Sequence, residues 1–343
     1  MLKRLLYGLP VLGIDLGSFM IRTVGPWGKM QMPSICSPSL GLVGKEAEEI
    51  EGRTPAEADC VWPFSDGAIQ DEVAGEVLLR HVLHETVQVS PWLRELLLHG
   101  QPGSLGAICA VPGWTTSSHR SSLKKMMQMV GLGKIWLVPS SFVIAQGISP
   151  NWTGLLILAG SSSWEIVRVV HGQPDKSRTL TISGREMDRM LQQYVRETHG
   201  CELGLRSLRE MKHALTTSRS VIVRGKAIDT GLPVTKRLVS AEVLPVLRQS
   251  FSVLADTIED LMIQASASVV PLLQESGVVI CGGASSLIQE EELARSLQNM
   301  HLLVRTIEKS DQAVMRGLDH MLKHVRRAEL GQATQTWSLM GEE

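Results

Sequence analysis

The sequence is short of cysteine, aromatic residues and net charge. Of its 343 residues only five are cysteine and 4% are aromatic, and the formal net charge is −1. The cysteines lie far apart with no CxxC pair, which argues against a zinc site or a disulfide framework and favours free thiols in a reducing compartment. A charge so close to zero gives no general attraction to nucleic acid, so we expect no nucleic-acid partner.

Long apolar runs are also missing. No run reaches the roughly 18 residues of a transmembrane helix, so we expect a protein of the cytoplasm or of the cytoplasmic face of a membrane. The rest of the composition is that of a soluble globular protein, with 43% hydrophobic and 20% charged residues. A chain of this length can form two domains with ample cores.

Apolar stretches of strand length alternate with stretches of helical period, and this alternation predicts the α/β class. Strands are expected at 10–16, 19–25, 106–111, 135–138, 154–159, 164–170, 219–225 and 277–281. Helices are expected at 72–89, 117–130, 185–199, 205–217, 241–265, 286–299 and 311–327. The polar segment 328–343 lacks an apolar stripe and is expected to form a loose C-terminal tail.

One pattern occurs twice. Residues 13–25 have the order strand, Gly/Ser turn, strand, and residues 156–172 repeat that order about 140 positions later. Small residues in such a turn let backbone N–H groups approach a phosphate, although an ordinary hairpin turn explains each copy equally well. Two like-folded halves could hold the phosphates of one nucleotide from opposite sides.

A third segment, 278–287, is a buried strand that ends in Gly-Gly before a helix, where the backbone could pack flat against a ligand. A plain strand-to-helix turn is the alternative. The first nine residues form a separate feature, because as a helix they would place leucines on one face beside two basic residues, as interfacial anchors do. A frayed terminus is the alternative there. The leucines are Leu2, Leu5, Leu6 and Leu9.

Together these segments resemble the actin-fold ATPases, and among them the family of the bacterial actin homologue MreB. The first phosphate loop of that family is similar to Gly13–Ser18 and its second to 158–164. The remaining matching segments, in chain order, are V-G-K-E-A at 43–47, G-R-T-P at 52–55, D-G-A-I at 66–69, Q-Y-V-R-E-T at 193–198 and C-G-G-A at 281–284. The resemblance covers about residues 1–325, and the magnetosome filament protein is a close relative within the same fold.

The resemblance implies an actin-like bilobed α/β fold, with two duplicated ribonuclease-H-like domains and a nucleotide cleft between them. It implies an amphipathic N-terminal segment 1–9, a first lobe over 10–150, a second lobe over 151–327 and a tail over 328–343. A hydrophobic loop of the first lobe that lies on the membrane in this family corresponds to 90–100. Trp92 and Leu93 there, with the leucines of 1–9, are the expected membrane contacts, and an ordinary buried helix extension is the alternative for 90–100.

Residue by residue, the resemblance places Asp15 at the first-loop acid, which works near the magnesium and its waters. His119 stands where the family has the glutamate that positions the attacking water. These two are the expected catalytic positions, and Asp15 is also the expected metal position. The expected nucleotide-binding residues are Gly17, Ser18, Phe19, Met20, Gly160, Ser161, Ser162, Ser163, Gly184, Arg209, Glu210, Lys212, Gly282, Gly283, Ala284 and Ser285.

Several positions depart from the family pattern. Leu158 replaces the aspartate of the second loop, and His119 lacks the charge of the glutamate. Arg209 replaces a ribose-binding glutamate, while Glu210 lies one position later on another helical face. Because phosphoryl transfer depends on positioning and charge compensation, we expect ATP or ADP to bind with weakened magnesium dependence and to be hydrolysed slowly or not at all. The alternative is a fold kept only as a scaffold, with an empty cleft.

The resemblance therefore predicts an actin-like cytoskeletal protein that forms or modulates membrane-associated filaments in cell-shape determination. Its expected partners are further copies of itself or an MreB-like homologue, the inner membrane surface, and cell-wall elongation proteins. One alternative is a regulatory pseudo-ATPase subunit of an active MreB-like or magnetosome-type filament. A second is an active ATPase or sugar kinase of the same superfamily, which the missing acids disfavour.

Overall fold

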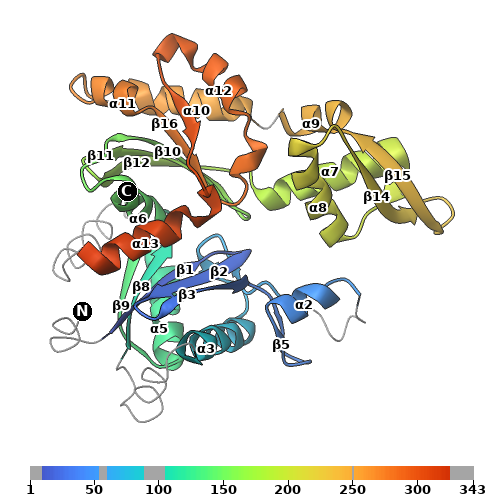
Figure 1. The fold of residues 1–343 in the computed structure, drawn as a ribbon, viewed down its shortest axis with the longest axis horizontal. Helices are drawn as coiled ribbons and strands as arrows, with labels where there is room; N and C mark the ends of the chain where they lie inside the picture. The colour runs from blue at the N-terminus through green and yellow to red at the C-terminus, as the bar shows by residue number, and fades with distance from the viewer. Residues whose placement is uncertain (1–9, 54–59, 89–104, 249–250, 325–343) are drawn as a thin grey trace. The chain divides into compact units, whose positions relative to one another are not determined.

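A computed structural model describes residues 10–53, 60–88, 105–248 and 251–324. The expected membrane contacts, Leu2, Leu5, Leu6, Leu9, Trp92 and Leu93, and the expected tail therefore lie outside the described residues. The chain divides into two compact units (Figure 1). Unit 1 comprises residues 1–152, 171–174 and 312–343, and unit 2 comprises 153–170 and 175–311. Among the described helices, each is too short or too polar to cross a lipid bilayer.

Unit 1 is built on a five-stranded sheet with the order β3-β2-β1-β8-β9. β1 is antiparallel to β2 and parallel to β8, so the first hairpin and a βαβ-type arrangement share one sheet. The strands are β1 (Val11–Leu16), β2 (Met20–Gly25), β3 (Gly28–Pro33), β8 (Leu105–Val111) and β9 (Leu132–Pro139). The unit also contains two short hairpins and a short helix. The hairpins are β4 (Cys36–Ser37) with β5 (Leu42–Val43) and β6 (Phe64–Ser65) with β7 (Ala68–Ile69), and the helix is α2 (Lys45–Ile50).

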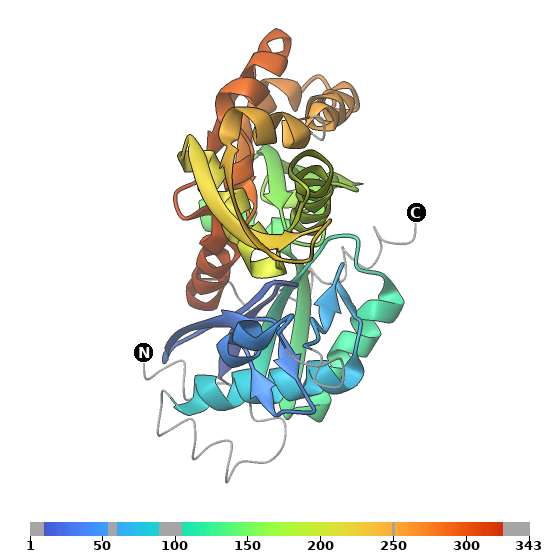
Figure 2. The ribbon, with the colours of Figure 1, turned by 90° about the vertical axis from the view of Figure 1, so that its right-hand side faces the viewer.

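Both faces of this sheet are covered by helices. α3 (Glu72–Gln88) and α5 (Ser117–Met129) contribute to the apolar cluster that contains Leu12 and Ile14. α6 (Ser140–Ile148) and α13 (Ala313–His324) contribute to the cluster on the opposite face, with Val24 (Figures 1 and 2). Successive residues of β1 thus serve different cores, as the period of two requires.

Unit 2 repeats the arrangement with the order β12-β11-β10-β16-β17. β10 is antiparallel to β11 and parallel to β16, as β1 is to β2 and β8. The strands are β10 (Gly154–Ala159), β11 (Trp164–Val170), β12 (Gln173–Leu180), β16 (Val278–Cys281) and β17 (Val304–Thr306). A second sheet has the order β13 (Cys201–Glu202), β14 (Ser220–Ala227), β15 (Pro233–Val239).

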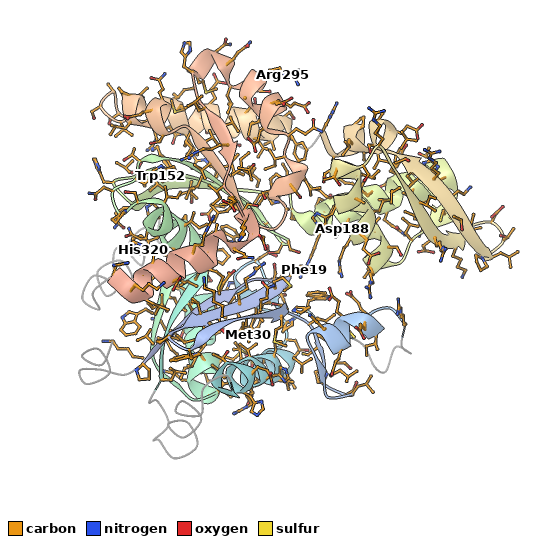
Figure 3. The ribbon with its side chains drawn as sticks, viewed as in Figure 1. Phe19, Met30, Trp152, Asp188, Arg295 and His320 are labelled. Atoms are coloured by element: carbon orange, nitrogen blue, oxygen red, sulfur yellow. The ribbon has the colours of Figure 1, made fainter. Side chains whose placement is uncertain are left out.

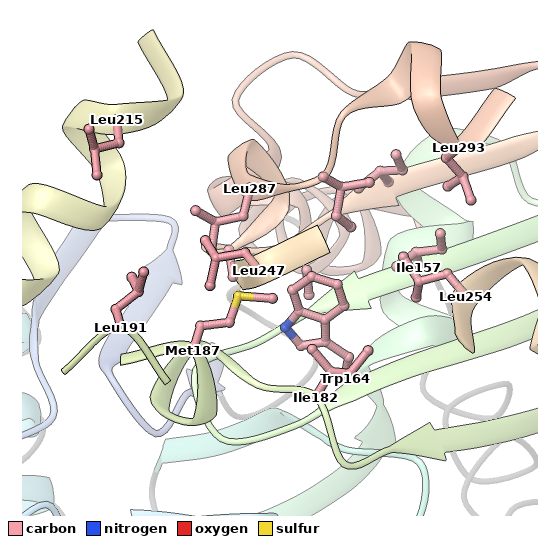
Figure 4. Close-up of a cluster of buried hydrophobic side chains, with 14 of the residues drawn as sticks. Ile157, Trp164, Ile182, Met187, Leu191, Leu215, Leu247, Leu254, Leu287 and Leu293 are labelled. Carbon is pink, nitrogen blue, oxygen red and sulfur yellow. The ribbon is translucent and has the colours of Figure 1, made fainter. Parts of the chain in front are cut away.

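The helices of unit 2 enclose a core around Trp164, which is fully buried and stacks on Phe251 at 5.9 Å between ring centroids. Figure 4 shows Trp164 beside Met187 and Ile182. The helices are α7 (Gly184–His199), α8 (Leu205–Thr217), α9 (Ser240–Arg248), α10 (Ser252–Ile263), α11 (Val270–Ser276) and α12 (Glu290–Ser296). Short 3₁₀ turns occur at Ser285–Leu287, Gln298–Met300 and Ser310–Gln312.

The eight strands predicted from the sequence are all present. The prediction of one helix over 241–265 was wrong, because α9 ends at Arg248 and α10 begins at Ser252. The predicted helix at 286–299 is also divided, into α12 and two 3₁₀ turns. The pattern did not predict β12, whose side chains are largely exposed and polar and therefore give no apolar alternation.

Candidate functional site

The first hairpin joins β1 to β2 through residues 17–19, which are three of the predicted nucleotide-binding residues. A Cβ on Gly17 would lie 2.5 Å from the carbonyl oxygen of Met20, so only glycine fits this turn. Ser34 fixes the tip, because its hydroxyl donates to the Gly17 carbonyl at 2.6 Å and its N–H donates to the Phe19 carbonyl at 2.9 Å. Both hydrogen bonds from Ser34 are accepted by backbone carbonyls of the turn, and they hold the turn in one shape.

Phe19 has a role in packing. Its ring stacks on Trp62 at 5.1 Å between centroids, and the Trp62 indole donates to the Glu51 carboxylate at 2.7 Å. Figure 3 places Phe19 at the tip of this hairpin. Any contact that Phe19 makes with a phosphate must therefore come from its backbone.

Asp15 lies near the end of β1 and is buried. It is directly opposite Arg22 in the antiparallel register, so both side chains lie on the same face of the sheet. The Arg22 Nη1 atom is 3.4 Å from the Asp15 Oδ2 atom. Burial raises the pKa of Asp15 above its ordinary value of 3.8, and the charge and hydrogen bond of Arg22 oppose that rise only in part.

The segment that contains His119 begins beside Asp15, because Asp15 pairs with Ala110 in the parallel register of β1 and β8. Thr116 caps the N-terminus of α5 by accepting from the His119 N–H at 3.2 Å. Arg120 donates to the Thr115 carbonyl at 3.1 Å. The His119 side chain is exposed in the first turn of α5, in contrast to the buried Asp15.

The second hairpin joins β10 to β11 through residues 160–163. A Cβ on Gly160 would lie 2.7 Å from the Ser163 carbonyl oxygen, so this turn also requires glycine. The indole N–H of Trp164 donates to the Gly160 carbonyl at 3.1 Å, which ties the turn to the core of unit 2. Leu158 pairs with Glu165 across the two strands, and Glu165 is buried.

Gly184 brings the start of α7 against this turn. The Gly184 N–H donates to the Gly160 carbonyl at 3.1 Å, and the Arg185 N–H donates to the Ser161 carbonyl at 2.9 Å. The contact is close, because a Cβ on Gly184 would lie 3.3 Å from the Cα of Ser161. The second turn and the first residues of α7 therefore form one continuous backbone structure.

Lys212 holds the same region from α8. Its ammonium group lies 2.6 Å from the Asp188 carboxylate and donates to the Gly184 carbonyl at 2.8 Å. Lys212 is buried, and burial lowers its pKa below the ordinary value of 10.5 although Asp188 acts in the opposite direction. Asp188 lies one turn into α7 (Figure 3). Lys212 thus connects α8 to the start of α7.

Arg209 and Glu210, which lie at and next to the position of the family's ribose-binding glutamate, are less buried than Lys212. Glu210 is exposed and accepts from Arg206 at 2.9 Å, in an i,i+4 pair along α8. Arg209 is partly buried. Two positions separate Glu210 from Lys212, so the helix turns them to different faces. Glu210 is therefore occupied on the surface of α8, away from the Lys212 face.

The Gly-Gly segment after β16 lies against the end of β10, at the Ala159 carbonyl that precedes the second turn. Gly282 has a positive φ of 104°, and a Cβ there would lie 2.3 Å from the Ala159 carbonyl oxygen. That carbonyl accepts from the Ala284 N–H at 3.0 Å. The hydroxyl of Ser285 lies 2.6 Å from that of Ser310. Gly283 is exposed, with open space where a Cβ would stand.

Unit 2 thus brings together four segments that the sequence singled out: the turn 160–163, Gly184, Lys212 and 282–285. The fold can offer a ligand backbone N–H groups and small side chains here, with a buried lysine behind them. Sequence reasoning missed Arg22, Asp188 and Glu165. Arg22 and Glu165 each stand seven residues after the loop-acid position of their hairpin, but this spacing places them opposite that position only in the hairpin register that the structure shows.

The architecture is that of the actin-like fold, as structural comparison shows. The structure superposes on "MreB5 of Spiroplasma citri bound to ADP" with a TM-score of 0.81, 21% identity, and coverage of 92% of this chain and 96% of that one. It superposes on the "MamK double helical filament" with a TM-score of 0.78, 20% identity, and coverage of 92% and 99%.

Sequence comparison identifies the family. The cell shape-determining protein MreB of Escherichia coli K12 is 24% identical over 259 residues, which cover 73% of this chain and 72% of MreB. The cell shape-determining protein Mbl of Bacillus subtilis 168 is 24% identical over 310 residues, covering 85% and 90%. The family described as MreB/Mbl protein matches residues 12–330. The chain belongs to the MreB/Mbl family of actin-like, cell shape-determining proteins.

Proposed function

We propose that this protein is a filament-forming, adenine-nucleotide-binding subunit that acts in cell-shape determination at the inner face of the cell membrane. The convergence of the turn 160–163, Gly184 and the segment 282–285 carries this proposal, because these elements keep their backbone donors and close approaches. Family membership supports self-association, since one solved neighbour is described as a double helical filament. ADP- and AMPPNP-bound neighbours support nucleotide binding.

Hydrolysis is proposed to be slow or absent. Leu158 offers no side-chain oxygen at the second-loop position, and the exposed His119 carries no fixed negative charge. Removal of one well-placed electrostatic group typically lowers a rate by about 10²–10³. Phosphate release should therefore lie at least that far below the rate of an intact homologue. A robust rate that Asp15→Ala abolishes would contradict this part of the proposal.

The test of filament formation is electron microscopy of the purified protein with ATP, alone and mixed with an intact MreB-type homologue. Filaments of the protein alone support the proposal. Incorporation of the protein into co-filaments with the homologue, when it forms no filaments alone, would favour the second candidate, a regulatory pseudo-ATPase subunit, for which Leu158 and His119 are the specific observations. Absence of filaments in both samples would refute both candidates.

Membrane association is proposed from Leu2, Leu5, Leu6, Leu9, Trp92 and Leu93. Sedimentation with anionic liposomes tests it. Deletion of residues 1–9 together with Trp92→Ser and Leu93→Ser should leave the protein in the supernatant, because the apolar anchors are lost. Deletion of residues 335–343 is the matched control and should leave sedimentation unchanged. Equal sedimentation of all three proteins would refute membrane association through these residues, and cell-wall elongation proteins would then be sought independently.

A further inference from the structure

The first hairpin contains a buried ion pair that bears directly on metal binding. Asp15 and Arg22 face each other across β1 and β2, with 3.4 Å between Oδ2 and Nη1. Their side chains are 12% and 13% exposed, so little water screens the two charges. The carboxylate at the predicted metal position therefore has a counter-ion supplied by the chain itself.

The second hairpin has the same register with different charges. Leu158 faces Glu165, as Asp15 faces Arg22, and both pairs stand seven residues apart. The position that corresponds to Asp15 thus carries no carboxylate, and the acid of this hairpin stands on β11. Across the described residues, no group of three or more histidine, cysteine, aspartate or glutamate side chains is placed to hold a metal ion.

Taken separately, neither hairpin offers an uncompensated carboxylate at its loop-acid position that would fit a divalent cation. A hydrated magnesium ion is drawn to uncompensated carboxylates. Here one expected carboxylate is paired with a guanidinium and the other is replaced by leucine. A guanidinium keeps its charge at any physiological pH, so Arg22 would repel a cation placed next to Asp15.

We propose that Arg22 is a built-in replacement for the divalent cation at the first hairpin, so that nucleotide binds equally well with and without magnesium. The proposal rests on the proposed nucleotide binding. Arg22 acts as a positioning residue through Asp15: by neutralising this carboxylate it removes the repulsion that a phosphate would otherwise meet. The backbone N–H groups of the turn at Gly17 and Ser18 then hold the phosphate without a metal bridge.

The experiment measures the dissociation constant of a fluorescent ADP analogue with millimolar magnesium and with EDTA. For the unmodified protein the two constants should agree within about threefold. In Arg22→Leu, magnesium should tighten binding by at least about tenfold at alkaline pH, where Asp15 is ionised although burial raises its pKa, because the uncovered carboxylate repels phosphate until a cation neutralises it. In the double variant Arg22→Leu/Asp15→Asn the two constants should again agree, because no charge is left to compensate.

Two further variants keep the test decisive. Arg22→Lys retains the counter-charge and should behave like the unmodified protein, which covers the case in which Arg22→Leu does not fold. Arg168→Leu removes another buried strand arginine, paired with Asp175 at 2.6 Å, and should not introduce magnesium dependence. This control separates loss of a buried, paired strand arginine in general from loss of Arg22.

The outcomes distinguish failure of the inference about Arg22 from failure of the proposed nucleotide binding. Binding by the unmodified protein that magnesium tightens about tenfold or more would overturn the inference and leave nucleotide binding intact. Loss of that dependence in Glu165→Gln would then show that Glu165 is the carboxylate that serves the metal. No saturable binding with magnesium or with EDTA would overturn both the inference and the proposed nucleotide binding.

Discussion

Lys212→Met removes one partner of a buried ion pair while it keeps most of the side-chain volume. Lys212 is 5% exposed and Asp188 is 14% exposed, and their charged atoms are 2.6 Å apart. The substitution leaves Asp188 with an uncompensated charge and the Gly184 carbonyl without its donor. Breaking a buried pair on one side typically costs about 3–5 kcal/mol. Because Asp188 retains some contact with water, we expect the lower end, about 3 kcal/mol.

The matched control is the double variant Lys212→Met/Asp188→Leu. Replacement of a whole buried ion pair by apolar residues is often neutral, so about 2 kcal/mol or more of the loss should be regained. Urea unfolding followed by circular dichroism gives the free energies. Hydrogen exchange of the α7 and α8 amides shows whether the change lies in unit 2.

A loss of less than about 1 kcal/mol in the free energy of unfolding of Lys212→Met would refute this role of the ion pair, and so would a double variant no more stable than the single one. Either result would mean that Lys212 is not principally a connection between α8 and the start of α7. The sequence assigned it to nucleotide binding, and a small stability cost with a large loss of affinity would favour that direct role. The structure favours an effect on binding that passes through Gly184.

Two other predictions concern unit 1. Gly317→Ala should lower the free energy of unfolding by about 1–3 kcal/mol in thermal unfolding, because its Cβ would lie 2.0 Å from the Val143 carbonyl oxygen where α6 and α13 cross. The control is Gly283→Ala in unit 2, which has open space at the Cβ and should change the free energy of unfolding by no more than about 0.5 kcal/mol. Equal effects of the two substitutions would contradict the packing argument. Asp319 has a lowered pKa because the hydrogen bond from Lys323 and the charge of Lys29 outweigh its burial. The ionised Asp319 therefore stabilises the folded state at pH values above its unfolded pKa, and Asp319→Asn should lower the free energy of unfolding by about 0.5–1 kcal/mol at pH 7. The difference in the free energy of unfolding between the variant and the unmodified protein should shrink as the pH falls below about 3.8, and a constant difference would contradict this assignment.

The elements that carry an apolar pattern could be predicted from the sequence. β1, β10 and α7 appear within one residue of their expected bounds, because burial of alternate or helically spaced residues leaves a periodic signal. β12 gave none, since most of its side chains are exposed and polar and it lies at the edge of its sheet, beside β11. The division into α9 and α10 was not predicted, because the apolar spacing of α9 continues in α10.

The candidate site could be predicted as a set of positions, but its internal pairings could not. Spacing along a helix shows that Lys212 and Glu210 face different sides. It cannot show that Asp188, on another helix, lies 2.6 Å from the lysine. The ion pair of Asp15 with Arg22 depends on hairpin register, which the turn length fixes and composition does not reveal.

The two hairpins show which constraints the fold places on these loops and which it does not. Gly17 and Gly160 each face a carbonyl oxygen within 2.7 Å of where a Cβ would stand, so the turns cannot change without rebuilding the strands. The loop-acid positions face no such limit, because a strand accepts aspartate beside arginine in one hairpin and leucine beside glutamate in the other. Turn geometry is therefore set by sterics, whereas the charge of each hairpin is free to vary without loss of the fold. A chain of this architecture can retain the shape that holds a phosphate while it changes the means by which that phosphate's charge is neutralised.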